Sequence, residues 1–288
     1  MKNFTCFLFL MFGIGNATLN AQQNVVLEAL EGCVVDIPAN ATCLCSTISF
    51  TKCSSVLGAT LNDDPSTSSG IEYDWSNATS STLGVGFGAT TNTRALVEIG
   101  GQCWARYNMD VVNSNLGAYV ANTDTGWSGY YNNAASEPAA NEGRLYQWSA
   151  AMNGSTTERA QGVCPSGWHV PSDCELMYLE NTLGMSVAEQ QIAAPRTTGT
   201  VGLKLAEVGY TMGGSPSTNS SGFSYILSGQ RANNGTYNGR GSSSSIKTST
   251  NITGAIVTRF LQTGSTGVER GVGGAFNSGG QQVRCIKD

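Results

Sequence analysis

The feature that most restricts the fold of this chain is its cysteine content. The sequence contains nine cysteines, and the first, Cys6, lies in a segment with the pattern of an export signal. That segment has a positive charge near its start, an apolar core at residues 7–14 and a small-residue cleavage site at residues 19–21. The apolar core is too short to span a bilayer. We therefore expect residues 1–21 to be removed, which leaves eight cysteines in a mature protein that begins at Gln22.

An even number of cysteines in an oxidising compartment predicts disulfides and no free thiol. The sequence has no Cys-x2-Cys pair and only one histidine, so we predict no metal site. Because Cys43 and Cys45 are separated by one residue, a bridge between them would be strained. We expect these two to pair with Cys33 and Cys53, in either of two arrangements. The full set of disulfide candidates is Cys33, Cys43, Cys45, Cys53, Cys103, Cys164, Cys174 and Cys285.

Charge and length narrow the class of protein. Charged residues make up 12% of the sequence, about half of the ~25% that is usual. Loss of Lys2 with the signal leaves 14 basic and 20 acidic residues, a net charge of 14 − 20 = −6. A mildly acidic surface argues against binding to nucleic acid or to an anionic membrane. The remaining 288 − 21 = 267 residues suffice for one large domain or two modest ones, and none of the later stretches resembles a membrane span.

Residues 22–90 differ from the rest of the chain. They contain four cysteines, and apolar residues occupy every second position in several stretches, as in half-buried strands. These stretches are Ile48/Phe50, Ile71/Tyr73/Trp75 and Leu83/Val85/Phe87, with a turn or linker at residues 62–70. We predict a small, disulfide-stapled β-rich module at 22–90, followed by a larger domain at 91–288.

The larger domain contains two clear helix signals. Apolar residues spaced i, i+3 and i+7 predict a helix over 145–152. A second helix is predicted to begin at Ser172, whose hydroxyl can cap the backbone while Glu175 reaches back in a capping box. This helix should stop at Gly184.

Shorter elements complete the prediction for this domain. A third helix is expected around 203–208, and strands are expected at 167–170, 223–227, 255–261 and 282–286. Two or three helices packed on a short, mostly antiparallel sheet make an α+β fold.

A string of motifs in this domain carries a family resemblance. In chain order the motifs are Ile99-Gly100-Gly101-Gln102-Cys103-Trp104, Gly143-Arg144-Leu145-Tyr146-Gln147-Trp148, Cys164-Pro165-Ser166-Gly167-Trp168-His169-Val170-Pro171-Ser172-Asp173, Ser221-Gly222-Phe223-Ser224 with Gly229-Gln230-Arg231, and Val283-Arg284-Cys285-Ile286-Lys287-Asp288. In this order the string resembles the Fibrobacter succinogenes major paralogous (FISUMP) domain family of secreted bacterial surface proteins. The resemblance covers about residues 90–288, and it implies a location outside the cell or on its surface. The strand–proline–capped-helix unit also resembles the C-type-lectin-like superfamily, which implies a lectin-like fold.

The family resemblance further implies a disulfide pairing. The Cys-Pro-Ser-Gly-Trp and Val-Arg-Cys motifs recur together in the family, so we expect a bridge between Cys164 and Cys285. This assignment leaves Cys103 to pair with Cys174. Arginines in apolar surroundings are expected to be structural hydrogen-bond donors, and these are Arg231, Arg259 and Arg284.

Residues suited to catalysis are scarce. The one histidine, His169, lies in a Trp-His-Val-Pro segment that matches a core motif of the family, and this match implies a structural role. A single imidazole without an identified partner is weak evidence for acid–base catalysis. The sequence has neither a Gly-x-Ser-x-Gly motif nor a Walker loop. We therefore predict no catalytic residues and no cofactor, and we expect the protein not to be an enzyme.

The loop at residues 126–133 is the best candidate for ligand binding. Its aromatic faces lie among amide and hydroxyl groups, a mixture that suits stacking on sugars. The candidate ligand-binding residues are Trp127, Tyr130 and Tyr131. Alternatively, these aromatics belong to a structural motif and face inward, as large aromatics usually do.

Two functions from different classes remain open at this point. The first is a secreted, non-catalytic protein for attachment that binds glycans or other cell-surface components. The second is a structural subunit of an extracellular filament or matrix, which would self-associate.

Overall fold

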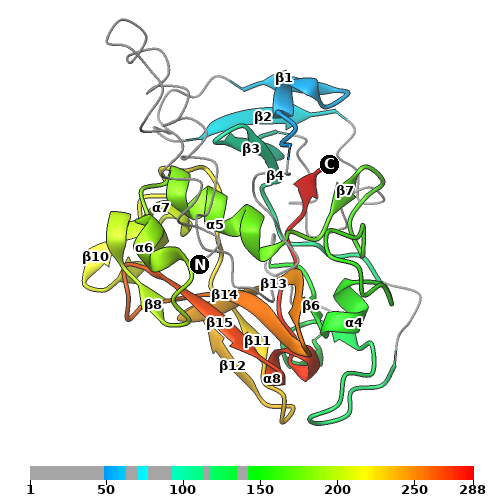
Figure 1. Cartoon of the computed structure of the whole chain (residues 1–288). Helices are drawn as coiled ribbons and strands as arrows, with labels where there is room; N and C mark the ends of the chain where they lie inside the picture. Colours follow the sequence, from blue (N-terminus) through cyan, green and yellow to red (C-terminus); the bar gives the residue numbers. More distant parts are fainter. Residues whose placement is uncertain (1–48, 63–69, 77–92, 113–116, 135–141) are drawn as a thin grey trace, which may run out of the picture.

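The computed structural model describes residues 49–62, 70–76, 93–112, 117–134 and 142–288 (Figure 1). The expected signal peptide, the cysteines ahead of Cys53 and the alternating stretch at 83–87 lie outside these residues. The described part is a mixture of helix and sheet in which short strands predominate and the helices are few and short. Within that part, no helix has the length and apolar character needed to cross a membrane.

Six short strands form the first sheet, and every neighbouring pair is antiparallel. In spatial order they are β1 (Ala59–Leu61), β2 (Ile71–Trp75), β3 (Leu96–Ile99), β4 (Gln102–Ala105), β16 (Ile286–Lys287) and β7 (Trp168–His169). The last strand in the sequence therefore lies between two earlier ones (Figure 1).

The boundary expected near residue 90 does not separate the described residues. β2 pairs with β3 from Ile71↔Glu98 to Tyr73↔Leu96, so residues on both sides of position 90 share one hydrogen-bonded ladder. In addition, a disulfide joins Cys53 to Cys103. The described residues of the expected N-terminal module therefore form the edge of the sheet that the larger domain completes.

Another six strands form the second sheet. In spatial order they are β12 (Tyr237–Arg240), β11 (Ser228–Arg231), β13 (Ser243–Ile252), β14 (Ala255–Gln262), β15 (Val268–Gly273) and β8 (Pro195–Arg196). All pairs are antiparallel except β11 with β13. Two small two-stranded sheets accompany it, β9 (Thr211–Met212) with β10 (Ser215–Pro216) and β5 (Ser128–Gly129) with β6 (Leu145–Tyr146).

The longest helix, α5 (Asp173–Thr182), begins as the sequence predicts. The Ser172 hydroxyl accepts a hydrogen bond from the Glu175 N–H at 3.2 Å, and the Ser172 N–H donates to Glu175 Oε2 at 2.8 Å, so the capping box is confirmed. The helix ends at Leu183, and Gly184 follows with a φ of 104°, a conformation that glycine adopts without strain. The remaining helices are α4 (Trp148–Ala151), α6 (Val187–Gln190), α7 (Val201–Leu205) and α8 (Ala275–Ser278), with 3-10 turns η2 (Cys53–Ser55), η3 (Tyr131–Asn133) and η4 (Thr198–Thr200).

Several sequence predictions of secondary structure need correction. The strand expected at 282–286 begins only at Ile286, and Gln282 makes a single bridge to Ile246. The helix expected over 145–152 begins only at Trp148, because Leu145 pairs with Gly129 in a strand and Gln147 is extended. The helix expected around 203–208 ends at Leu205, after which the backbone is again extended. The strand expected at 223–227 is reduced to one bridge between Tyr225 and Ala206, since Ser224 has a φ of 53°.

Buried apolar side chains form two clusters, and the first sheet contributes to both. In β4, Cys103 and Ala105 belong to one cluster, whereas Trp104 between them belongs to the other. This division follows from the alternation of side chains along a strand. Because β3 and β4 are buried along their whole length, the first sheet is covered on both faces at its centre.

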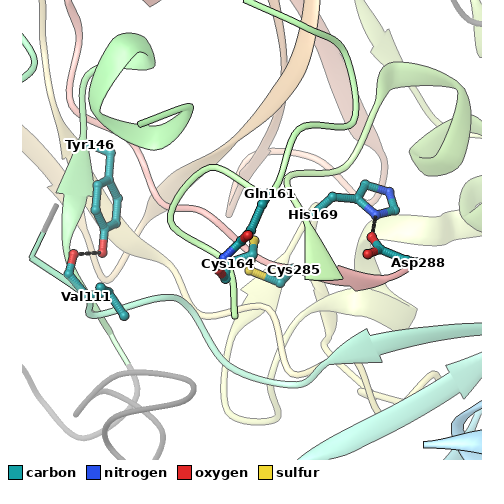
Figure 2. The surroundings of a disulfide bond; sticks show 7 residues. All are labelled: Val111, Tyr146, Gln161, Cys164, His169, Cys285 and Asp288. Carbon is teal, nitrogen blue, oxygen red and sulfur yellow. Dashed lines mark hydrogen bonds and ion pairs between the residues drawn. A yellow bond between two sulfur atoms is a disulfide. The ribbon is translucent and has the colours of Figure 1, made fainter. Parts of the chain in front are cut away.

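The disulfides confirm one predicted pair and correct two. Cys164 is bonded to Cys285, as the family resemblance implies (Figure 2). Cys103 is bonded to Cys53, not to Cys174, because η2 places Cys53 beside β4 with 4.7 Å between the two Cα atoms. The expectation that Cys53 pairs within residues 33–53 was therefore wrong. Cys174 is also disulfide-bonded.

Candidate functional site

A buried glutamine fixes the loop that carries the candidate aromatics. Gln147, from the Gly143–Trp148 motif, has no exposed surface. Its Oε1 accepts hydrogen bonds from the N–H groups of Thr125 at 2.8 Å and Trp127 at 2.9 Å. Its Nε2 donates to the carbonyl oxygens of Thr123 at 2.8 Å and Ser278 at 2.9 Å. Because both the oxygen and the nitrogen of the amide are hydrogen-bonded, Gln147 holds the loop in one conformation.

Trp127 is a buried support and not a presented binding surface. Its side chain is 8% exposed, and it meets the Tyr119 ring edge-on at 5.5 Å between centroids. A Cβ atom at Gly129 or Gly280 would lie only 2.5 Å or 2.7 Å from the indole, so both glycines are needed to accommodate it. The expectation that Trp127 stacks on a ligand is therefore corrected, because the pairing of β5 with β6 turns the ring inward.

Arg231 lies above this indole at the end of β11, surrounded by aromatic rings. Its guanidinium carbon is 3.5 Å from the centroid of the Tyr119 ring, 4.6 Å from that of Trp127 and 5.0 Å from that of Tyr237. The Nε–H donates to the carbonyl oxygen of Gly235 at 3.2 Å. Attraction between a cation and ring faces stabilises this arrangement. These contacts fix the orientation of the guanidinium, but none of them neutralises its positive charge.

The aromatic row continues from β12 to η3. The rings of Tyr237 and Tyr131 have centroids 5.3 Å apart, and the Tyr237 hydroxyl donates to Asn133 Oδ1 at 2.7 Å. The guanidinium carbon of Arg240 is 5.6 Å from the centroid of Tyr131, and its Nε lies 3.0 Å from Glu142 Oε1. All of these side chains are partly exposed.

We call this partly exposed group the aromatic–arginine face, formed by Tyr119, Tyr131, Arg231, Tyr237 and Arg240. Of the three residues expected to bind a ligand, Tyr131 belongs to the face and Trp127 supports it. Tyr130 points to a separate ion pair, where its hydroxyl donates to Asp110 Oδ2 at 3.2 Å and its ring faces the Arg144 guanidinium at 4.3 Å.

The hydroxyls of Tyr119 and Tyr237 are neutral around pH 7. Burial raises the pKa of Tyr119 and Tyr237 above 10.0, and the nearby positive charge of Arg231 only partly opposes this. A neutral hydroxyl both donates and accepts a hydrogen bond. The face therefore offers rings, hydroxyls and guanidinium groups side by side.

His169, the only histidine, is enclosed between two carboxylates. Its Nδ1 is 2.6 Å from Asp288 Oδ1, a contact drawn as a dashed line in Figure 2, and its Nε2 is 2.8 Å from Glu175 Oε1. Arg159 Nε lies 2.9 Å from the same Glu175 oxygen. Burial alone would raise the pKa of Glu175, but the hydrogen bond and charge of His169, together with the charge of Arg159, hold it below 4.5. The His169 ring is 1% exposed, so it links β7, α5 and the C-terminal strand and is closed to solvent.

A chain of five buried charges lies beneath α5, and of its members only Arg259 was expected from the sequence to be a structural residue. Arg196 makes two hydrogen bonds to Glu180, at 2.8 Å each, and Arg259 Nε lies 2.6 Å from the same carboxylate. Arg259 also contacts Asp173 at 2.7 Å, and Arg270 contacts Asp173 at 2.6 Å. All five side chains are at most 3% exposed. We call this chain the buried ion network, and it joins α5 to β8, β14 and β15.

One further hollow contains fewer groups suited to chemistry. A hollow of about 520 Å³ beside the end of α5 has no charged lining residue, since it is bounded by Gly100, Tyr178, Asn181, Thr182, Gly184 and Met185. Among the described residues, no group of three or more His, Cys, Asp or Glu side chains is placed to hold a metal ion.

Comparison with known proteins identifies a domain family. The sequence matches the family described as the Fibrobacter succinogenes major domain over residues 97–287. That range includes every member of the aromatic–arginine face and of the buried ion network. No curated protein and no solved structure matches the chain.

Proposed function

The chain belongs to the Fibrobacter succinogenes major domain family, which indicates a bacterial surface protein, and from this premise we propose that it is secreted for attachment and binds carbohydrate through the aromatic–arginine face. The disulfides support a location outside the cell, where such bonds persist. The unit of β7, Pro171 and capped α5, followed by the disulfide-bonded C-terminal strand, supports a lectin-like fold as part of this proposal.

The row of partly exposed rings is the observation that carries the proposal. The rings of Tyr119 and Tyr237 are fixed by hydrogen bonds and by Arg231. The Tyr131 ring packs against Tyr237 and lies near Arg240. Sugars have apolar C–H faces and polar edges, so they suit a surface where rings alternate with hydroxyl and amide groups. Because the supporting Gln147 and Trp127 are buried, the rings need little reordering when a ligand binds.

We also infer that the protein has no catalytic activity. Catalysis requires groups that reach a substrate with matched proton affinities. His169 is closed to solvent, and the Asp173 and Glu180 carboxylates are occupied by arginines. Beside the face, the Glu142 carboxylate is paired with Arg240.

The proposal is tested by measuring glycan binding of the purified full chain and of Tyr237→Ala. If the face binds sugar, this variant should lose ~1–3 kcal/mol of binding free energy, the value of one aromatic contact with its buried area. That corresponds to a rise in Kd of about 5- to 150-fold. Tyr178→Ala is the matched control, because it removes a partly exposed tyrosine from α5, outside the face. Equal affinity of Tyr237→Ala and the unmodified protein would refute the assignment of the site.

A specific observation favours the second function, a structural subunit. β1 is the outermost strand of the first sheet. Beside it Leu57 is 86% exposed, Leu61 59% and Ile71 49%. A sheet edge flanked by exposed apolar side chains favours association between copies. Concentration-dependent sedimentation of the full chain tests this function, and Leu61→Lys should then reduce the assembly. A protein that stays monomeric at all concentrations would exclude it.

A further inference from the structure

We propose that Arg231 is a receptor for carboxylate, so that the ligand of the aromatic–arginine face is an acidic glycan that carries uronic acid. This inference rests on the proposed function and specifies its ligand class. It follows from the contacts that Arg231 makes and from those that it lacks.

A comparison of all the arginines sets Arg231 apart. The sequence has ten, and all of them lie in the described residues. Eight pair with a carboxylate: Arg94, Arg106, Arg144, Arg159, Arg196, Arg240, Arg259 and Arg270. Arg284 does not, but it is fully buried, and its terminal nitrogens donate to Asn108 and to the carbonyls of Phe223 and Ser224. Among the described residues, Arg231 alone combines partial exposure with the lack of a carboxylate partner.

The unused donors of Arg231 lie on its terminal nitrogens. A guanidinium has five N–H donors, and the Nε–H is the one that Arg231 uses, toward Gly235. Neither terminal nitrogen donates to a described residue, and neither is among the buried polar atoms that lack a partner. Both therefore reach solvent, and together they form the fork that binds a carboxylate through two parallel hydrogen bonds.

The surrounding rings explain why this fork is preorganised. The guanidinium carbon of Arg231 lies over the Tyr119 ring, 3.5 Å from its centroid, so the ring supports the guanidinium from one side. The Tyr119 hydroxyl donates to the carbonyl oxygens of Ala232 and Asn233 at 2.7 Å each, which fixes that ring to the turn after β11. A flexible arginine would lose side-chain entropy on binding, and this clamp removes most of that cost beforehand.

The position of the fork among tyrosine rings selects the class of anion. A carboxylate attached to a sugar ring can reach Arg231 while the sugar stacks on Tyr237 or Tyr131, the two rings next along the row. A small inorganic anion could use the guanidinium but would leave the rings unused. The sugar acid satisfies both parts of the face at once.

Binding of oligogalacturonate and of its methyl ester tests the inference directly. The two ligands share the sugar rings and differ in the charge that Arg231 recognises. We expect calorimetry to give a Kd for the acid that is at least about tenfold lower than that for the ester. This ratio corresponds to a difference of about 1.4 kcal/mol in binding free energy. Arg231→Gln should remove this preference while it retains binding of the ester. Arg94→Gln is the control, because its arginine pairs with Glu72 outside the face and the preference should persist.

The possible outcomes separate the two proposals. If the acid and the ester bind the unmodified protein equally, the carboxylate receptor is refuted while sugar binding stands. If Arg231→Gln keeps the preference for the acid, Arg231 is not the receptor. If neither ligand nor any neutral glycan binds, both proposals fall. The comparison of the two ligands on the unmodified protein needs no variant, so a variant that fails to fold does not prevent the test.

Discussion

Arg259 and Arg231 lie in the same sheet, yet their surroundings are opposite. Arg259 is 2% exposed in β14, and its guanidinium contacts the carboxylates of Glu180 and Asp173. Arg231 in β11 is partly exposed, and aromatic rings take the place of carboxylates around it. A buried charge requires a paired partner, whereas a charge that reaches solvent does not. Carboxylates thus fix Arg259 in the core by pairing with its charge, whereas aromatic rings fix Arg231 on the face without pairing with its charge.

This difference separates structural arginines from those available to a ligand. In the buried ion network, three guanidinium groups share two carboxylates, and Arg259 uses both of them. The positions of these side chains are fixed by their ion pairs, and the network is too deeply buried to bind a further anion. On the face, contact with aromatic rings orients Arg231, and its terminal N–H groups remain available to a ligand.

The largest effect should come from neutralising a carboxylate in the buried ion network. Glu180→Gln leaves the guanidinium groups of Arg196 and Arg259 close together with no carboxylate between them, so the free energy of unfolding should fall by about 3–5 kcal/mol. The same change at Glu142, which pairs with the partly exposed Arg240, should cost less than about 1 kcal/mol. Urea unfolding of both variants measures the contrast, and equal losses would remove the distinction between core and face.

The next largest effect concerns the support beneath the face. Trp127→Ala removes a buried indole and leaves a cavity between Gly129 and Gly280, at a cost of about 3–4 kcal/mol. Tyr237→Ala removes a partly exposed ring and should cost clearly less. A thermal melt of each variant is the measurement. If the two melting temperatures fall by the same amount, Trp127 and Tyr237 do not differ as support and surface.

A third test concerns a buried cation that lacks a carboxylate partner among the described residues. Burial lowers the pKa of Lys247 from 10.5 to about 7, although Asp124 partly opposes this. Between these two values the unfolded chain holds a proton that the folded protein does not, so stability should rise with pH. The rise is at most about 1.4 kcal/mol per pH unit. Lys247→Met should reduce the slope of unfolding free energy against pH between about pH 7.5 and 9.5. An unchanged slope would mean that Lys247 does not cause this pH dependence.

The smallest effect on stability should come from Arg231 itself. Arg231→Met removes its contacts with the rings of Tyr119, Trp127 and Tyr237, which are worth about 0.5–1 kcal/mol at exposed sites. It uncovers no buried carboxylate, so the free energy of unfolding should change by about 1 kcal/mol or less. A loss comparable with that of Glu180→Gln, measured by urea unfolding, would show that Arg231 is a structural residue after all.

Local sequence patterns predicted the parts of the fold that depend on neighbours in the chain. The Ser172–Glu175 capping box is such a part, since the two residues are three positions apart and cap the same helix. The pairing of Cys164 with Cys285 followed from family motifs. Leu145 has helical spacing with Trp148, but its pairing with the distant Gly129 prevailed.

The candidate site was only partly predictable, because it is assembled from distant segments. The sequence singled out Tyr131 for its place in an aromatic loop, but Tyr119, Arg231 and Tyr237 come from other segments that meet only in the fold. The β11–β12 hairpin brings Arg231 opposite Tyr237, and Asn234-Gly235 between them is a local hairpin signal, but no local pattern places Tyr119 beside Arg231. Trp127 lies in the same loop as Tyr131, and only the distant Gly280 shows that its ring is enclosed.

The place of β16 in the first sheet has a consequence for the order of events in biogenesis. Residues 286–287 lie between β4 and β7, so the sheet stays incomplete until these residues have been synthesised. The Cys164–Cys285 bond spans 121 positions and depends on the same late arrival. Pairing over such long separations is slow compared with local helix formation. Under the secretion proposed above, we expect the first sheet to close only after residues 286–287 have crossed the membrane.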